Sequence, residues 1–254
     1  MDGRGRNGMI TLSTRRLDKA EVLRWKACET ALIICDMWDR HTCKSAERRV
    51  AEMAPRIDAF AKPLREKGVL IIHAPSAVMT FYEGTPERAA AKAAPFTPAP
   101  MAIDWQEPDP AREGPMPVDD DDWCDDTPKC PIKEIEEKGA WPWTRQISTI
   151  GIRPGDAVSD DGQEIYNLLQ QRGIDNVIMT GVHLNRCVLG RPYGIRQLIK
   201  LGKNVVLVRD LTDGLYDPRQ RPYVSRAQGM ELLVRHVEKF WCPSALRGDI
   251  SWTE

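Results

Sequence analysis

Short apolar runs recur along the chain and predict its strands. Residues 31–37, 69–75, 176–182 and 204–211 are rich in β-branched and other apolar side chains. They do not alternate between apolar and polar positions, which is typical of strands that are covered on both faces. A weaker run at 147–152 is predicted to add another strand. The pattern therefore indicates a mostly parallel sheet.

Segments with helical periodicity lie between these strands. Residues 44–67, 163–171, 188–201 and 226–240 repeat apolar side chains at the spacing of a helix face. Strands that alternate with helices favour right-handed crossovers. We therefore expect an α/β fold with a doubly wound, mostly parallel sheet flanked by helices on both faces, in three layers. With 42% hydrophobic residues, residues 1–254 are predicted to form a single domain.

A Pro-rich stretch at about 95–145 interrupts this alternation. It is far longer than the roughly 2–6 residues of an ordinary connection, so we interpret it as a loop inserted into the domain. The acidic run at 119–122 is expected to be a solvated surface. Trp141 and Trp143, at the end of the stretch, are expected to pack as a lid or in a subunit contact.

Charge and cysteine usage exclude several classes of protein. Lys and Arg number 36 against 37 for Asp and Glu, so no basic field is available for nucleic acid. No apolar run approaches the roughly 18 residues that a membrane span requires, and we expect a cytoplasmic protein without a membrane partner. The seven cysteines form no CxxC pair, so most are expected to be reduced, with Cys35 in the core.

Chemistry in a parallel sheet is expected beyond the carboxyl ends of its strands. Asp36, His73 and Arg153 follow predicted strands, and Cys187 follows the run at 176–182 where a helix is predicted to begin. A thiol at a helix N-terminus faces unpaired N–H groups and the positive end of the dipole, so its pKa is expected to be lowered. Cys187 is therefore a candidate nucleophile on a sharp turn.

These residues resemble a known family. Asp36, the segment GVHLNRCV at 181–188 and the strand NVVLVRDLT at 204–212 are similar to the isochorismatase-like cysteine hydrolases, which include nicotinamidases and N-carbamoylsarcosine amidohydrolases. The resemblance implies that Cys187 is the nucleophile, Asp36 its base and the Val182 to His183 peptide bond cis. Backbone N–H groups of His183 and Cys187 are implied as the oxyanion donors.

The family lysine has no evident counterpart. Arg153 lies nearest in the chain to the position of the family lysine and is the candidate to replace it. Lys133 and Lys138 of the insertion are the alternative candidates. Arg191, shortly after the cysteine, is expected to bring a fixed charge near the pocket. Two readings follow from the resemblance: a cysteine hydrolase that cleaves the C–N bond of a small amide or carbamoyl substrate through a thioester, or a catalytically silent protein that binds a small molecule.

Other residues are candidates for the pocket or for a metal. Trp38, His73, Tyr82 and Arg191 are expected to line the substrate pocket. Asp39, His41 and His73 are weak candidates for metal ligands, but we expect neither a metal nor another cofactor. The expected partners are a small-molecule substrate and further copies of the chain in a homo-oligomer. An interaction module that uses the Pro-rich insertion is a third, weaker interpretation.

Overall fold

The computed structural model describes residues 8–119, 124–126 and 128–253, so most of the acidic run at 119–122 lies outside the described residues. The strands are β1 (Met9–Arg16), β2 (Lys19–Lys26), β3 (Thr30–Cys35), β4 (Leu70–Ala74), β5 (Ala157–Val158), β6 (Asn176–Val182), β7 (Asn204–Asp213), β8 (Ser244–Ala245) and β9 (Ile250–Thr253). The α-helices are α1 (Lys44–Lys67), α2 (Pro86–Lys92), α3 (Ile132–Lys138), α4 (Gly162–Gln171), α5 (Ile195–Lys200) and α6 (Arg226–Phe240).

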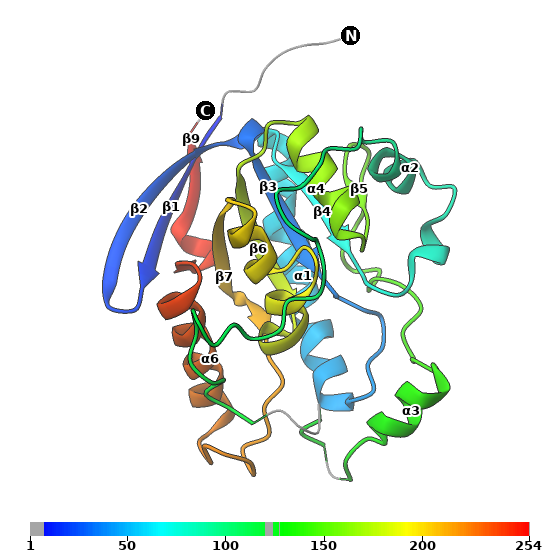
Figure 1. Ribbon diagram of the computed structural model, residues 1–254, viewed down its shortest axis with the longest axis vertical. Helices are drawn as coiled ribbons and strands as arrows, with labels where there is room; N and C mark the ends of the chain where they lie inside the picture. Colours follow the sequence, from blue (N-terminus) through cyan, green and yellow to red (C-terminus); the bar gives the residue numbers. More distant parts are fainter. Residues whose placement is uncertain (1–7, 120–123, 127, 254) are drawn as a thin grey trace.

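The described strands form one sheet in the order β2-β1-β8-β7-β6-β3-β4-β5, with β9 paired to β1 (Figure 1). All pairs from β8 to β5 are parallel, whereas β1 pairs antiparallel with β2, β8 and β9. The predicted α/β fold with a mostly parallel sheet is therefore confirmed. The antiparallel hairpin of β1 and β2 was not predicted, although the burial of β1 alternates along the strand.

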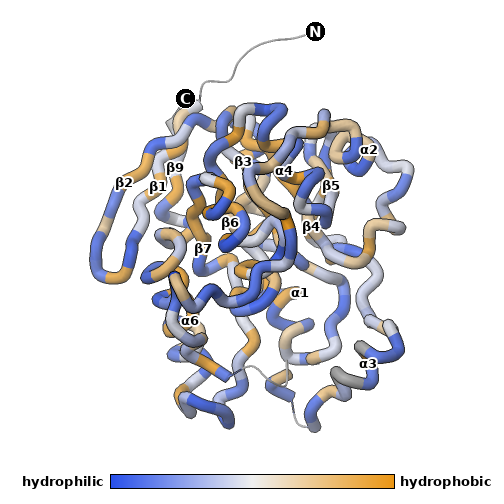
Figure 2. Tube along the Cα trace, in the orientation of Figure 1, coloured by the Kyte–Doolittle hydropathy of each residue, from blue (hydrophilic) through white to orange (hydrophobic). Residues whose placement is uncertain are grey.

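Helices cover both faces of the sheet and explain why the central strands are apolar throughout. Neighbouring side chains of β3 point to opposite faces: Ile33 packs with α4, α5 and α6, whereas Leu32 and Ile34 pack with α1. Both faces exclude water, so every residue of β3 is buried. Figure 2 shows the hydrophobic colouring concentrated in the middle of the sheet. No helix in the described ranges is long and apolar enough to cross a membrane.

Two elements differ from the sequence prediction. The run at 147–152 is a loop, because the Ile150 N–H turns back to bond the Ile147 carbonyl at 3.1 Å, and β5 occupies the sheet position instead. The helix predicted at 188–201 is divided into a π-helical turn at Leu184–Val188 and the short α5. Pro192 lies between these two pieces and supplies no N–H donor, which accounts for the division.

A buried carboxylate fixes the insertion to the helices beneath it. Glu113 accepts hydrogen bonds from both ends of the Arg196 guanidinium at 2.7 and 3.0 Å, from the Trp241 indole at 2.9 Å, and lies 2.8 Å from Nε2 of His236. Burial opposes the ionisation of Glu113, but these bonds from His236, Arg196 and Trp241 together outweigh it and lower its pKa. The insertion is therefore held to α5 and α6 by a charged anchor.

Replacing this anchor should destabilise the protein. We expect Glu113→Gln to cost about 3–5 kcal/mol, because it leaves the buried Arg196 without a counter-charge. Glu107→Gln, an exposed position in the same insertion, should change the free energy of unfolding by less than about 0.5 kcal/mol. Urea denaturation of the two variants measures the difference, and equal midpoints would contradict the anchor.

The same carboxylate gives stability a predictable dependence on pH. Because the pKa of Glu113 is lowered in the folded state, its contribution is fully present above the ordinary pKa of a glutamate, about 4.3. That contribution is lost as the pH falls below this value toward the lowered pKa. The difference in stability between wild type and Glu113→Gln should therefore shrink on acidification.

Candidate active site

The candidate site lies where β3 and β6 end side by side. Cys35, the last residue of β3, is paired with Gly181 of β6. Gly181 has a φ of 108°, and a Cβ atom there would collide with the Cys35 carbonyl oxygen. Only glycine permits this close approach. It brings the turn that carries Cys187 against Asp36, the residue that follows β3.

Asp36 is fully buried, and its carboxylate is held from three sides. One oxygen accepts the Ser76 backbone N–H at 2.7 Å, and the other accepts the Arg191 Nε–H at 3.2 Å. The Cys187 thiol also lies beside this carboxylate, which helps to raise the pKa of the thiol. A buried carboxylate is stabilised only when it is paired and hydrogen-bonded, and these three contacts meet that requirement.

Cys187 lies in the π-helical turn Leu184–Val188 directly after β6. The peptide bond between Val182 and His183, which precedes this turn, is cis. Burial and the Asp36 carboxylate raise the pKa of Cys187 to about 12, although Arg191 acts in the opposite direction. The predicted lowering of this pKa is therefore wrong, because burial disfavours the thiolate and the neighbouring carboxylate adds a negative charge.

Arg191 supplies the cation of the site, and the prediction that Arg153 does so is wrong. Arg153 lines a different cavity, beside Phe81 and Arg145, and its backbone N–H binds Asp156 at 2.8 Å. Lys138 is exposed, and the side chain of Lys133 lies outside the described part of the chain. Arg191 follows Cys187 by one helical turn, and this spacing was the signal in the sequence that the two residues lie close together. In the structure the backbone N–H of Arg191 bonds the Cys187 carbonyl at 3.0 Å.

A pocket of about 280 Å³ opens onto Cys187. It is lined by Trp38, His41, Thr42, Ala77, Trp105, Trp141, Trp143, His183, Arg186, Cys187, Arg191 and Leu215. Trp143 is stacked between Trp38 at 4.3 Å and Trp141 at 4.6 Å, measured between ring centroids. The insertion therefore contributes a wall of this pocket through its two terminal tryptophans, in the manner expected of a lid.

Of the four residues expected in the pocket, Trp38 and Arg191 line it and His73 and Tyr82 do not. His73 is buried, with its ring nitrogens 3.1 Å from Oε1 of Gln146 and 3.0 Å from Asp156. The hydroxyl of Tyr82 accepts the Gln146 N–H at 2.8 Å. Both side chains are thus engaged beside the pocket, in the packing between β4 and the loop before β5.

The three weak metal candidates are also separated from one another. Asp39 binds the backbone and hydroxyl of Thr144 at 2.8 and 2.7 Å, and His73 is engaged as described above. Nδ1 of His41 accepts the Cys43 N–H at 3.0 Å. Burial lowers the pKa of His41 to about 4, so near neutral pH its remaining nitrogen is an N–H donor. These residues do not assemble a ligand set.

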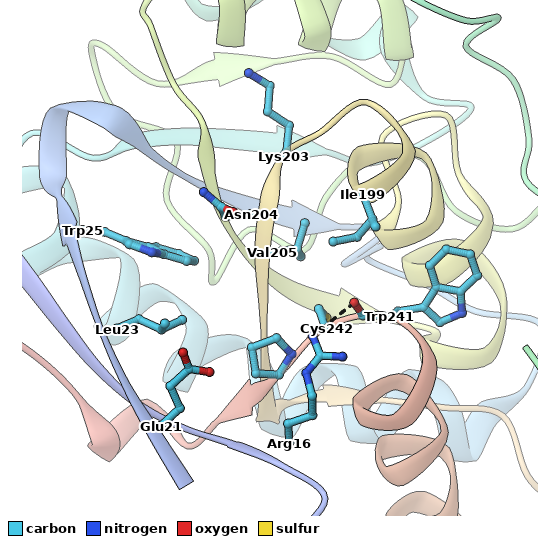
Figure 3. A pocket seen from close by; sticks show the side chains of 11 residues that line it. Arg16, Glu21, Leu23, Trp25, Ile199, Lys203, Asn204, Val205, Trp241 and Cys242 are labelled. Carbon is cyan, nitrogen blue, oxygen red and sulfur yellow. Dashed lines mark hydrogen bonds between the residues drawn. The ribbon is translucent and has the colours of Figure 1, made fainter. Parts of the chain in front are cut away.

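A second cavity, of about 310 Å³, lies away from this site (Figure 3). Lys203 and Asn204, at the beginning of β7, line it together with Trp25 of the hairpin. The beginning of a parallel strand is at the opposite end from its catalytic edge. Burial raises the pKa of Cys242, which also lines this cavity, to about 12, so this thiol is protonated near neutral pH.

Comparison with solved structures supports the fold. The chain is similar to a cysteine hydrolase from Pseudomonas syringae pv. phaseolicola 1448A, with 13% identity, 94% of each chain covered and a TM-score of 0.56. An isochorismatase-like hydrolase from Alkaliphilus metalliredigens aligns with 12% identity over 87% of this chain and 94% of that one, at a TM-score of 0.48. No protein-family model and no curated protein matches the chain. The first of these likenesses shows that the chain shares the α/β fold of that cysteine hydrolase.

The contacts of Cys187 predict an unusual response to mutation. Asp36→Asn removes the negative charge that raises the thiol pKa and leaves Arg191 in place, so Cys187 should be alkylated faster than in the wild type. At about pH 8 we expect the labelling rate to rise about threefold for each unit by which the pKa of Cys187 falls. The thiolate fraction rises about tenfold per unit, but a less basic thiolate is a weaker nucleophile, which offsets part of this gain. Iodoacetamide labelling followed by peptide mass spectrometry measures the rate.

Asp39→Asn is the matched control, because Asp39 binds Thr144 and not the thiol. It should leave the labelling rate of Cys187 unchanged. Slower labelling of Cys187 in a folded Asp36→Asn protein would contradict the assigned contact between carboxylate and thiol.

Proposed function

We propose that this protein is a cysteine hydrolase that cleaves the C–N bond of a small amide or carbamoyl-type substrate through a thioester on Cys187. The observation that carries the proposal is the buried Asp36 carboxylate, which contacts both the Cys187 thiol and the Arg191 guanidinium at the edge of a small pocket. A fold shared with a cysteine hydrolase is consistent with it.

The first step is attack on the substrate carbonyl. Because the pKa of Cys187 is about 12, the resting group is a thiol, and Asp36 accepts its proton as the sulfur bonds to the carbonyl carbon. The carbonyl electron pair moves to oxygen. We assign the backbone N–H groups of His183 and Cys187 as the donors that stabilise this oxyanion.

The second step breaks the C–N bond. Protonated Asp36 gives its proton to the leaving nitrogen, so ammonia or an amine departs and the thioester remains. Water then attacks the thioester carbon while Asp36 accepts one of its protons. The C–S bond breaks, the acid product leaves, and the proton on Asp36 returns to the Cys187 sulfur, which restores the starting state.

Arg191 acts through its fixed positive charge, since a guanidinium does not titrate in this range. Burial opposes that charge, but Asp36 and Cys187 stabilise it, so the pKa of Arg191 is raised. The charge in turn acts against the rise in the Cys187 pKa and stabilises negative charge on the sulfur during the reaction.

The pocket indicates what the rest of the substrate carries. His41 is a neutral N–H donor, and Nε1 of Trp143 and Nε2 of His183 are buried without a hydrogen-bond partner among the described residues. Arg191 adds a positive charge on the same wall. A small substrate with hydrogen-bond acceptors next to a flat apolar group fits these donors and the stacked tryptophans.

The alternative is a silent protein that binds a small molecule in the same pocket. The raised pKa of Cys187 and the non-titrating arginine favour this reading. The two proposals differ in turnover: the hydrolase releases ammonia or an amine and the binding protein releases none.

Hydrolysis of a panel of small amides and N-carbamoyl compounds, followed by ammonia release, tests the proposal. Cys187→Ala should fold but lose at least about 1,000-fold in kcat/KM, because the nucleophile is removed. Arg191→Met should lose about 100-fold, as expected when charge stabilisation of a transition state is lost. Arg153→Met is the matched control and should retain wild-type turnover. Full activity in Cys187→Ala would exclude the mechanism.

A further inference from the structure

Three cysteines and an aspartate gather at the start of α1, outside the machinery assigned to Cys187. Cys43 is the residue that precedes α1, and Cys124, Asp126 and Cys130 come from the insertion. The sulfurs of Cys43 and Cys124 and a carboxylate oxygen of Asp126 all lie within 4.8 Å of one another. Cys124 forms a disulfide with Cys130, which packs on the same cluster.

The carboxylate of this cluster is held by hydrogen bonds from the first residues of α1. Asp126 accepts the hydroxyl of Ser45 at 2.6 Å and the backbone N–H groups of Lys44 and Ser45, at 2.5 Å for Lys44. These hydrogen bonds from Ser45 and Lys44 hold the Asp126 carboxylate in one orientation. Cys43 and Cys124 are buried beside it, at 0% and 4% exposure.

We propose that the reduced protein binds one Zn²⁺ through Cys43, Cys124, Cys130 and Asp126. Three thiolates and a carboxylate make the tetrahedral sulfur and oxygen set that zinc accepts in structural sites. Zn–S bonds of about 2.3 Å place two sulfurs of a tetrahedral site about 3.8 Å apart. The sulfurs of Cys124 and Cys130, which are bonded to each other in the disulfide, move apart to that separation after reduction.

Zinc and the disulfide are alternative states of Cys124 and Cys130. A phosphine and one water molecule convert the disulfide into two thiols and a phosphine oxide, so two electrons pass from phosphorus to sulfur. Zn²⁺ then replaces the protons of the three thiols, which are released to solvent, and four bonds to zinc form. Arg49 and Arg226, at 3.0 and 3.2 Å from the neighbouring Asp125, balance the charges of Asp125 and Asp213 beside the site.

The site joins the insertion to the segment that leads into the pocket. His41 and Thr42 line the pocket, and Cys43 follows them directly. Leu215 belongs both to the pocket lining and to the apolar cluster around the cysteines. Zinc would therefore fix the insertion to the rim of the pocket through residues other than the Glu113 anchor, and with no part in the chemistry at Cys187.

Metal titration of the full chain tests the site independently of any hydrolase activity. The phosphine-reduced, chelator-treated protein should bind one equivalent of zinc, and cobalt(II) in its place should show the charge-transfer absorption of thiolate ligands. The oxidised protein should not bind, because Cys124 and Cys130 are then joined. Cys43→Ser should weaken zinc binding by more than about 100-fold. Loss of a residue that only hydrogen-bonds to a metal ligand already weakens binding by roughly 10–100-fold, and Cys43 is proposed as a ligand itself.

Cys28→Ser is the matched control, because Cys28 is an exposed free cysteine, and it should bind zinc as the wild type does. Asp126→Asn provides a second test if Cys43→Ser fails to fold, and it should weaken binding while retaining the thiolate absorption of cobalt. The proposal is overturned if the reduced wild type binds no zinc, if the oxidised form binds equally well, or if Cys43→Ser and Cys28→Ser bind with the same affinity.

Discussion

The candidate site depends on one interaction, the pairing of the buried Asp36 carboxylate with Arg191. Removing a carboxylate from water costs several kcal/mol even after the protein relaxes, so Asp36 requires a counter-charge and hydrogen-bond donors where β3 ends. Arg191 and the Ser76 N–H supply them at 3.2 and 2.7 Å. The same carboxylate holds the Cys187 thiol, so the position of the proposed nucleophile follows from the requirements of the buried charge.

The insertion uses the same physical device in a different place. Glu113 is buried against Arg196 as Asp36 is against Arg191, and it fixes the insertion to α5 and α6. Near the other end of the insertion, Trp143 stacks on Trp38 and Trp141 stacks on Trp143, and the two complete the wall of the pocket. A segment with little regular structure is thus made part of the pocket by a charged anchor and by aromatic stacking.

Much of the fold could be predicted because local and tertiary preferences agree there. The strand β6 and the helices α1 and α6 have the predicted bounds, and Asp36 and Cys187 lie at strand ends where chemistry was expected. The short β5 was missed because two residues carry no periodic signal. In the hairpin of β1 and β2, the burial of β1 alternates along the strand. The matching alternation of residues in its sequence, MITLSTRR, was available as a signal for a strand.

The charge partners of the site were harder to predict because they depend on where loops lead. Arg153 is adjacent to the sheet in sequence, yet its loop directs it to another cavity, whereas Arg191 returns to Asp36 from the turn after Cys187. The pKa of Cys187 likewise depends on the distance of a carboxylate that belongs to another strand. Sequence position identifies the reacting groups, but tertiary packing decides which charges surround them.

The proposed hydrolase forms a covalent thioester on Cys187, with Asp36 as the base. The most direct test of this step is rapid acid quenching of the enzyme during turnover of an accepted amide, followed by intact-mass and peptide mass spectrometry. We expect an added acyl mass on the peptide that contains Cys187, formed before the acid product and lost as that product appears. Turnover without an acyl adduct on Cys187, or with the adduct on another residue, would contradict it.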